Sequence, residues 1–248
     1  MADYDPFREF EVGDNDEDLA RDDKEKFSPQ KDETYRVSLA WWQSQKSPDG
    51  RILFKMDSAK PRMLQTKILY GGKGVGYAIY KGPEYARLLG REPEDRIATV
   101  VVSWPVFRKG GNAGKTDPDL FKAGRYEVLP WIFSKHKYQQ VLRAHNTKPL
   151  GRGDLRITCT NAQYQHLEMG SYEDNYLRKI MESKPELFEE IRLRVAEVAG
   201  KLKKHLGTDY TLEELREKVG LEGGQPEVGE IATSGEDFDD LIDGLTES

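Results

Sequence analysis

Runs of alternating apolar and polar side chains, rich in β-branched and aromatic residues, predict that most of this chain forms β-strands. The most apolar of them, Ile97–Phe107, is the centre of the pattern. Ser47–Gly50 predicts a turn, because proline sets φ at the second position and glycine accepts left-handed geometry. Arg51–Met56 is expected to return from that turn as a hairpin partner of the first strand. The predicted strands are 34–42, 51–56, 63–70, 97–107, 125–133 and 154–160.

Beyond Gln165 the apolar period becomes helical, with Leu187, Ile191 and Val195 on one face. Ser183–Glu186 has the pattern of a capping box with proline in the first turn, and Thr211–Glu214 is a second cap. Shorter helices are expected at 84–90, where a glycine ends the segment, and up to residue 145 after the strand at 125–133. The pattern therefore predicts a mainly β fold with an α-helical appendage.

Charge changes this picture, because the formal net charge of −6 is distributed unevenly. Residues 1–34 carry a net charge of −8 and residues 35–165 carry +13. Residues 166–220 carry −2 and residues 221–248 carry −9, with no basic residue in the last segment. We expect an acidic, largely disordered segment (1–33), a basic body (34–165), a helical appendage (166–220) and a disordered acidic tail (221–248). A basic body predicts a polyanionic partner, although cations that merely solvate a β-domain would give the same count.

Composition excludes several classes of protein. The single cysteine, Cys159, allows no intramolecular disulfide and no zinc site built on paired cysteines. No apolar run approaches the roughly 20 residues of a membrane span, and the acidic N-terminus is unlike a signal peptide. We therefore expect a soluble, cytoplasmic protein with no membrane partner.

Catalytic and cofactor-binding patterns are weak. The four histidines have no metal-ligand spacing, and acidic residues concentrate in the two ends, which are poorly suited to preorganise a site. Gly71–Gly76 is glycine-rich, but its lysine is not followed by the serine or threonine of a phosphate-binding loop, and the sequence continues as a strand. We predict a basic β-loop there, no metal, no cofactor and no enzymatic activity.

Aromatic side chains next to cations favour a surface that stacks bases and neutralises phosphates. Each stacked base is worth roughly 1–3 kcal/mol, so three or four stacks would suffice for useful affinity. For Trp104, Trp131 and Phe133 a core position is an equal alternative, and Trp42 and Tyr77 are similarly undecided. The predicted DNA-binding residues are Tyr35, Trp42, Phe54, Lys55, Lys73, Tyr77, Tyr80, Lys81, Trp104, Phe107, Arg108, Lys109, Lys115, Arg125, Tyr126, Trp131, Phe133, Lys135, Lys137, Arg152 and Arg156.

The acidic tail is punctuated by large apolar residues. Such a segment can imitate a nucleic-acid backbone while its apolar side chains enter a partner's pocket, although a solubilising tail has the same composition. The predicted partner-binding residues are Asp237, Phe238, Asp239, Asp240, Leu241 and Ile242.

Several of these segments resemble a known family, the T4-type phage single-stranded DNA-binding proteins. The resemblance lies in Arg125–Phe133 with the basic 135–137, in Leu155–Thr160, in Ser171–Asp174 and in the tail at 237–242. It implies an OB-fold β-barrel whose groove holds the strand, and a tail that covers the groove and recruits replication proteins. The zinc module and basic N-terminal arm of the T4-type are missing, so zinc-free T7-type binders, which dimerise through the tail, are a nearer analogue.

The combined prediction is an OB-fold-like β-barrel with C-terminal helices and a disordered acidic tail. Its expected function is sequence-independent binding of single-stranded DNA in phage-type DNA replication, recombination and repair, in the host cytoplasm if a phage encodes it. Replication and recombination proteins are expected at the tail, and a homodimer is one option. An RNA-binding or chaperone OB module and a non-enzymatic scaffolding protein remain alternatives, because stacking does not distinguish the sugar.

Overall fold

An antiparallel seven-stranded sheet forms the centre of the computed structural model, which describes residues 26–40, 42–48, 52–55, 63–122, 124–160 and 167–220. The strand order is β5-β4-β6-β1-β8-β9, and β7 pairs with β6 outside this path. A separate hairpin consists of β2 (Gln43–Lys46) and β3 (Ile52–Lys55). The strands of the large sheet are β1 (Thr34–Leu39), β4 (Leu64–Tyr70), β5 (Tyr77–Ile79), β6 (Glu94–Trp104), β7 (Glu127–Ser134), β8 (Leu155–Cys159) and β9 (Leu167–Ser171).

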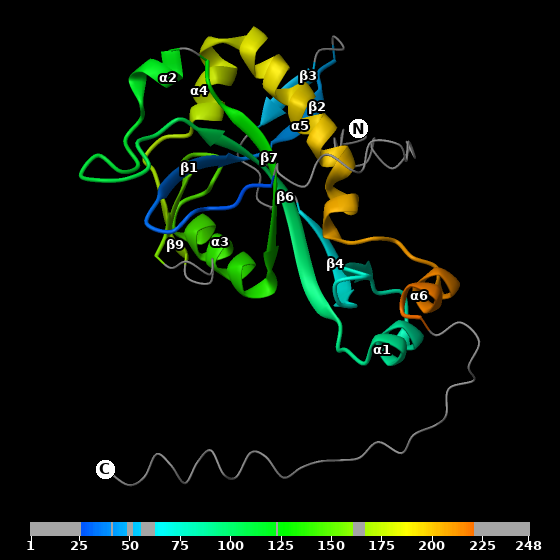
Figure 1. Ribbon diagram of the computed structural model, residues 1–248. Helices are drawn as coiled ribbons and strands as arrows, with labels where there is room; N and C mark the ends of the chain where they lie inside the picture. The colour runs from blue at the N-terminus through cyan, green and yellow to red at the C-terminus, as the bar shows by residue number, and fades with distance from the viewer. Residues whose placement is uncertain are drawn as a thin grey trace, which may run out of the picture.

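The longest strand of the sheet, β6, joins its two halves. Its first residues, 94–98, pair with β4, and residues 101–104 pair with β1. Along the same length β7 pairs with residues 96–103. In Figure 1 β6 runs diagonally through the molecule, with β1 and β9 near one end and β4 near the other. One continuous β-rich segment therefore sets the distance between the two halves.

Helices cover both faces of the sheet. On one face α3 packs on a core that includes Val37, Ile97 and Val101. On the other face α4 and α5 pack on Val100 and Val102. Because alternate residues of a strand point to opposite faces, the unbroken apolar run of β6 supplies both cores. The helices are α1 (Pro83–Leu89), α2 (Pro118–Lys122), α3 (Lys135–Thr147), α4 (Tyr176–Ser183), α5 (Pro185–Leu206) and α6 (Leu212–Lys218).

The predicted closed barrel is wrong for the described strands, whereas the mainly antiparallel β class with several helices is confirmed. The outer strands of the path, β5 and β9, do not pair with each other, and β7 pairs only with β6 among these strands. The sheet stays open because β4 and β1 use different stretches of β6, which separates the two halves instead of curling them together. Figure 1 shows this arrangement.

Local signals had mixed outcomes. The Thr211–Glu214 capping box is formed at the start of α6, and Gly90 ends α1 in the left-handed conformation. The box predicted at Ser183–Glu186 is not formed: α5 is capped by Lys184, and the Ser183 hydroxyl donates to the Lys179 carbonyl. Strand β3 pairs with β2, residues 43–46, instead of with the first strand, and the turn predicted at 47–50 lies partly outside the described residues.

Two further outcomes concern the ends of the predicted domains. Strand β9 lies inside the segment predicted to be a helical appendage, and α4, α5 and α6 follow it within the same segment. Phe27 packs against Tyr35 and Trp131 in the core, although the first 33 residues were predicted to have little structure. The partner-binding residues 237–242 of the tail lie outside the described residues.

Candidate nucleic-acid interface

Five aromatic residues predicted to stack on bases lie in the hydrophobic core. Their side chains are between 0% and 7% exposed, so base stacking is wrong for Tyr35, and for the other four, which the sequence left undecided, the core alternative is observed. The physical reason is their place in the sheet, where β1, β6 and β7 face helices on both sides. These residues are Tyr35, Trp42, Trp104, Trp131 and Phe133.

The other predicted residues divide by exposure. Phe107 and Tyr77 are each 40% exposed, whereas Tyr80, Tyr126, Arg108 and Lys137 are partly buried. Lys81 is exposed and pairs with Asp209. The side chains of Phe54 and Lys55 lie outside the described part of the structure. The exposed cations of the prediction are Lys73, Lys109, Lys115, Arg125, Lys135, Arg152 and Arg156.

The glycine-rich basic loop that follows β6 folds back on itself. A β-bridge joins Val106 to Thr116, and the Phe107 N–H donates to the Lys115 carbonyl at 3.0 Å. Gly114 has a φ of 83°, a conformation that glycine adopts readily. Its carbonyl accepts a 2.8 Å hydrogen bond from the Tyr172 hydroxyl. The loop is therefore anchored to the segment after β9, with Lys115 exposed beside the anchor.

A cleft of about 410 Å³ lies between this loop and the β1–β8 pair, and we call it the basic cleft. Lys115 and Arg156 are exposed on its wall, and none of the described residues that line it is acidic. The Tyr172 ring, partly buried, closes one side. Its lining residues are Arg36, Ala113, Gly114, Lys115, Thr116, Arg156 and Tyr172. Two exposed cations beside an aromatic ring suit a phosphate with an adjacent planar group.

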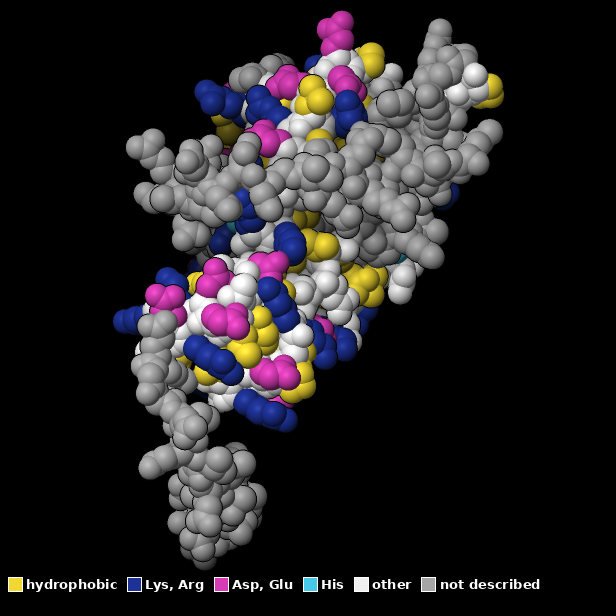
Figure 2. Space-filling model, turned by 90° about the vertical axis from the view of Figure 1, so that its right-hand side faces the viewer, with side chains coloured by type: hydrophobic (Ala, Val, Ile, Leu, Met, Phe, Trp, Pro, Cys, Tyr) yellow, Lys and Arg dark blue, Asp and Glu magenta, His cyan; other side chains and the backbone are white. Residues whose placement is uncertain are grey.

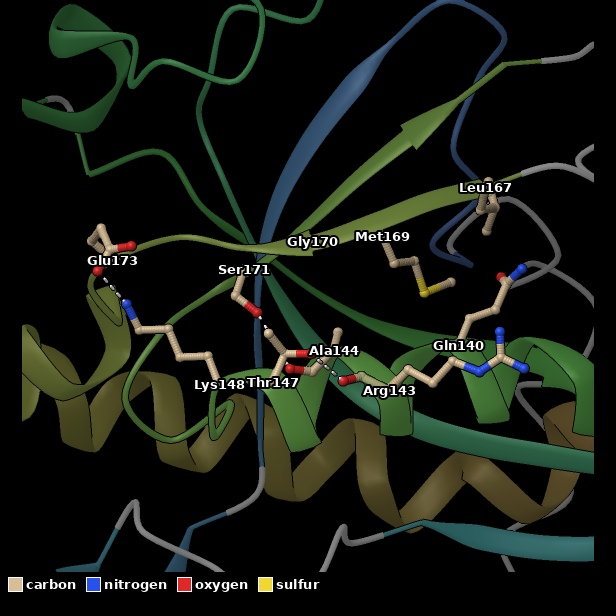
Figure 3. Close-up of a pocket in the computed structure, with 10 residues that line it drawn as sticks. All are labelled: Gln140, Arg143, Ala144, Thr147, Lys148, Leu167, Met169, Gly170, Ser171 and Glu173. Carbon is tan, nitrogen blue, oxygen red and sulfur yellow. Dashed lines mark hydrogen bonds and ion pairs between the residues drawn. The ribbon is translucent and has the colours of Figure 1, made fainter.

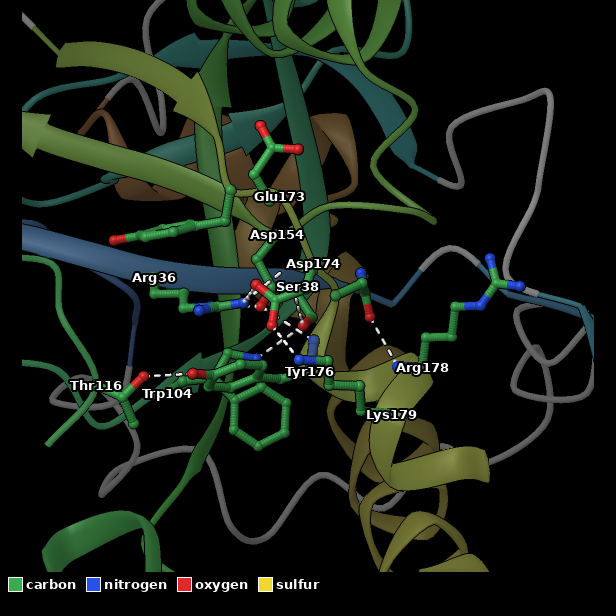
Figure 4. Close-up of polar contacts among 12 residues, drawn as sticks. Arg36, Ser38, Trp104, Thr116, Asp154, Glu173, Asp174, Tyr176, Arg178 and Lys179 are labelled. Carbon is green, nitrogen blue, oxygen red and sulfur yellow. Dashed lines mark hydrogen bonds and ion pairs between the residues drawn. The ribbon is translucent and has the colours of Figure 1, made fainter. Parts of the chain in front are cut away.

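Buried ion pairs hold Arg36 at the back of the basic cleft. Its Nε donates to Asp154 Oδ2 at 2.6 Å, and its Nη2 donates to Asp174 Oδ1 at 2.6 Å. The guanidinium carbon lies 4.3 Å from the Tyr172 ring centroid and 3.4 Å from that of Tyr176. Figure 4 shows the guanidinium directed toward Asp154 and Asp174. The arrangement fixes the orientation of both tyrosine rings through cation–π contact.

The same network shifts the pKa of its members. Burial alone would lower the pKa of Arg36, but Asp154 and Asp174 outweigh it and raise the pKa above its usual value. Burial also opposes ionisation of Asp174, yet hydrogen bonds from Lys179 and Arg36 hold its pKa below the usual range. Burial raises the pKa of Tyr172. At neutral pH the back wall of the cleft is therefore an ion-pair network in which Asp154 and Asp174 compensate the charge of Arg36, and the Tyr172 phenol at its side is protonated.

A second exposed cation–aromatic group lies at the other end of β6. Tyr70 and Tyr77 pair across β4 and β5, with ring centroids 5.1 Å apart, and are 46% and 40% exposed. Arg96 of β6 stacks over the Tyr77 ring at 4.2 Å. The intervening loop carries exposed Lys73 and leads from strand to strand, as predicted for a basic β-loop. We call this group the tyrosine pair.

The separation of the two groups follows from strand geometry. Arg36 is opposite Trp104, and Thr66, four residues before Tyr70, is opposite Arg96. At about 3.3 Å per residue, the stretch of β6 between Arg96 and Trp104 is about 26 Å long. A flexible chain that contacts both groups would have to extend over several repeat units.

A larger groove, of about 640 Å³, lies between α3 and β9 (Figure 3). Its charges are mixed, because Lys148 pairs with Glu173 at 2.6 Å while Arg143 is directed along the helix. Gln140 Oε1 is buried there without a hydrogen-bond partner in the described structure. The face seen in Figure 2 likewise intermixes basic and acidic side chains over the lobe that holds α1 and α6. Neither surface has the single sign of charge found in the basic cleft.

Sequence reasoning missed the residues that organise the interface. Tyr172, Arg36 and Arg96 were not among the predicted binding residues, nor was Tyr70, the most exposed ring of the tyrosine pair. The Tyr35–Arg36 neighbours did signal a ring beside a charge, but strand alternation buries Tyr35 with the α3 core and turns Arg36 to the other face. Tyr70 could have been found from its position directly before the glycine loop.

Lys137, at the start of α3, gives a pH-dependent prediction. Burial lowers its pKa to about 8; Cys159 opposes the shift and Arg96 adds to it. The pKa of an unfolded lysine is about 10.4, so between these values the unfolded chain binds more protons and stability rises with pH. We expect wild type to gain stability relative to Lys137→Met as pH rises from 7 to 10, measured by urea unfolding of both. A stability difference independent of pH would contradict this.

Comparisons of the chain with models of known protein families, with curated proteins and with solved structures gave no match. None of the described helices combines the length and apolar character needed to cross a membrane. The described residues contain no group of three or more histidine, cysteine, aspartate or glutamate side chains placed to hold a metal. The basis for a function is therefore the chain's own residues.

Proposed function

We propose that this protein binds single-stranded DNA without sequence preference. The basic cleft carries the proposal: exposed Lys115 and Arg156 meet there beside the Tyr172 ring, and none of the described residues that line it is acidic. Strand phosphates would lie against Lys115 and Arg156, since cation–phosphate contacts supply the sequence-independent part of affinity. Exposed rings, including the tyrosine pair, would stack bases, because every base has a π-face.

The resemblance to T4-type and T7-type phage binders extends the proposal to DNA replication, recombination and repair. The sheet would then be an open variant of the OB-fold, in which both halves of the sheet share the long strand β6. The acidic tail would recruit replication proteins, as the same resemblance implies. These finer statements rest on the motifs at 125–137, 155–160, 171–174 and 237–242.

The test of the proposal is the double variant Lys115→Gln with Arg156→Gln. A charge-assisted hydrogen bond is worth about 1.5–3 kcal/mol, so removing two cations from the strand phosphates should weaken binding of an oligo(dT) strand about tenfold or more. The slope of log K against log salt should become shallower by about 0.7 for each phosphate that the variant no longer neutralises. Fluorescence anisotropy of labelled oligo(dT) at several salt concentrations measures both quantities.

The matched control is Lys201→Gln, which removes an exposed cation of α5 that pairs with Glu197. It should leave affinity and salt slope unchanged. Equal behaviour of the control and the double variant would overturn the assignment of the cleft. Tighter binding of matched RNA than of DNA would favour the RNA module instead, and absence of binding to either at low salt would favour a scaffolding role.

A further inference from the structure

Four aromatic rings surround a cavity of about 360 Å³ next to the basic cleft, and we call it the aromatic pocket. Trp104 forms its floor, with ring centroids 6.4 Å from Phe121, 6.2 Å from Tyr126 and 5.9 Å from Tyr176. Phe121 and Tyr176 are 5.1 Å apart. Trp104 ends β6, Phe121 belongs to α2, Tyr126 lies between α2 and β7, and Tyr176 begins α4. A planar, apolar group would contact rings on several sides.

The remaining lining residues include positively charged side chains. Arg125, Lys179 and Lys184 line it, and no acidic residue does. Lys179 also contacts Asp174, and the Ser183 hydroxyl in the lining donates to the Lys179 carbonyl. An occupant that combines an aromatic ring with negative charge therefore matches both the floor and the cations of this pocket.

The aromatic pocket and the basic cleft share a wall. The Tyr176 ring lines the aromatic pocket, while its other contacts are with Arg36 and Thr116, which line the basic cleft. Arg36 lies 3.4 Å from the ring centroid, and the Tyr176 and Thr116 hydroxyls are hydrogen-bonded. Figure 4 shows Tyr176 between Thr116 on one side and Lys179 on the other. One ligand could thus place a phosphate in the cleft and a ring in the pocket.

We propose that the aromatic pocket takes one nucleobase of the strand whose phosphates lie in the basic cleft. The inference rests on the proposed function and adds a specific base subsite to it. Shared walls favour a nucleotide over an acidic peptide, because phosphate and base belong to one repeat unit and need no second ligand. An inserted base contacts aromatic rings without sequence-specific hydrogen bonds, so the subsite accepts any base that fits.

The experiment compares two probes of equal length and charge: oligo(dT) and a strand of the same length whose nucleotides are abasic. Phe121→Ala removes one wall of the pocket and no charge. It should weaken oligo(dT) binding about fivefold to a hundredfold, the range for one stacked base, and leave binding of the abasic strand unchanged. Leu120→Ala is the matched control, because Leu120 is the neighbouring residue, 46% exposed and outside the pocket.

The outcomes separate this inference from the proposed function. If wild type binds no single strand, the proposed function fails. If the double cleft variant weakens both probes but Phe121→Ala changes neither, only the base subsite is overturned. Tighter oligo(dT) binding by Phe121→Ala would also overturn it, because an acidic segment of the chain would then occupy the pocket in competition with DNA.

A second measurement avoids any change in folding. Wild-type protein is photocrosslinked to a strand carrying 5-iododeoxyuridine, and the crosslinked peptides are identified by mass spectrometry. Crosslinks to Phe121, Tyr126 or Tyr176, the partly exposed rings of the pocket, are the expected result. Crosslinks confined to the tyrosine pair and Tyr172 would overturn the subsite and leave the proposed function intact.

Discussion

Replacing Asp154 by alanine is expected to lower the free energy of unfolding by about 3–5 kcal/mol, because it leaves the buried charge of Arg36 without its main partner. Asp154 is 0% exposed and Arg36 is 4% exposed. The carboxylate also accepts hydrogen bonds from the Ser38 hydroxyl and the Tyr176 N–H. Removing it therefore leaves several buried donors without an acceptor at once. Equilibrium urea unfolding, followed by far-ultraviolet circular dichroism, measures the decrease.

Three comparison variants give this prediction its specificity. Asp174→Ala should destabilise less, because that carboxylate is one-third exposed and the Arg36–Asp154 pair remains. Glu173→Ala removes the exposed partner of Lys148 and should change stability by less than about 1 kcal/mol. The paired replacement Arg36→Met with Asp154→Leu should recover part of the stability, since it removes the unpaired buried charge but not the unsatisfied Ser38 hydroxyl and Tyr176 N–H. Equal destabilisation by Asp154→Ala and Glu173→Ala would contradict the buried network.

Strands and helices with a strong local period were predictable from the sequence. The run at 97–107 became β6, and the helical spacing of Leu187, Ile191 and Val195 became α5. Both signals depend on neighbours within a few residues, which the sequence shows directly. Closure of the sheet depends instead on which stretch of β6 each partner uses, and this register is a long-range property. The closed barrel was predicted from the family resemblance, and this prediction was wrong because of the register on β6.

The sequence predicted the basic residues of the candidate interface, but it did not predict which aromatic residues line it. Lys115 and Arg156 belong to basic segments that the sequence shows clearly, and both are exposed in the cleft. Trp131, which the sequence left undecided between core and stacking, is buried in the core, whereas Tyr172, which was not among the predicted binding residues, lines the cleft. An aromatic residue suits a core and a stacking surface equally well, so only the packing around it decides.

Replacing Gly153 by alanine is expected to be among the most damaging single changes near the interface. A Cβ at this position would lie 2.2 Å from the Tyr172 carbonyl oxygen and 3.2 Å from two carbons of Lys148. The backbone around it is fixed, because the Asp154 N–H donates to the Asp174 carbonyl and the Tyr172 N–H to the Asp154 carbonyl. Overpacking of this kind costs about 1–3 kcal/mol, and backbone contacts place this case at the upper end.

Gly111→Ala is the matched control in the nearby basic loop, because a Cβ there meets nothing within 4 Å. It should change the free energy of unfolding by less than about 0.5 kcal/mol. Gly153→Ala must move Tyr172, whose ring contacts Arg36 and whose hydroxyl anchors Gly114. Oligo(dT) affinity should therefore fall in Gly153→Ala even under conditions where it is fully folded. A destabilised variant with wild-type affinity would show that the position of Tyr172 matters for folding and not for the cleft.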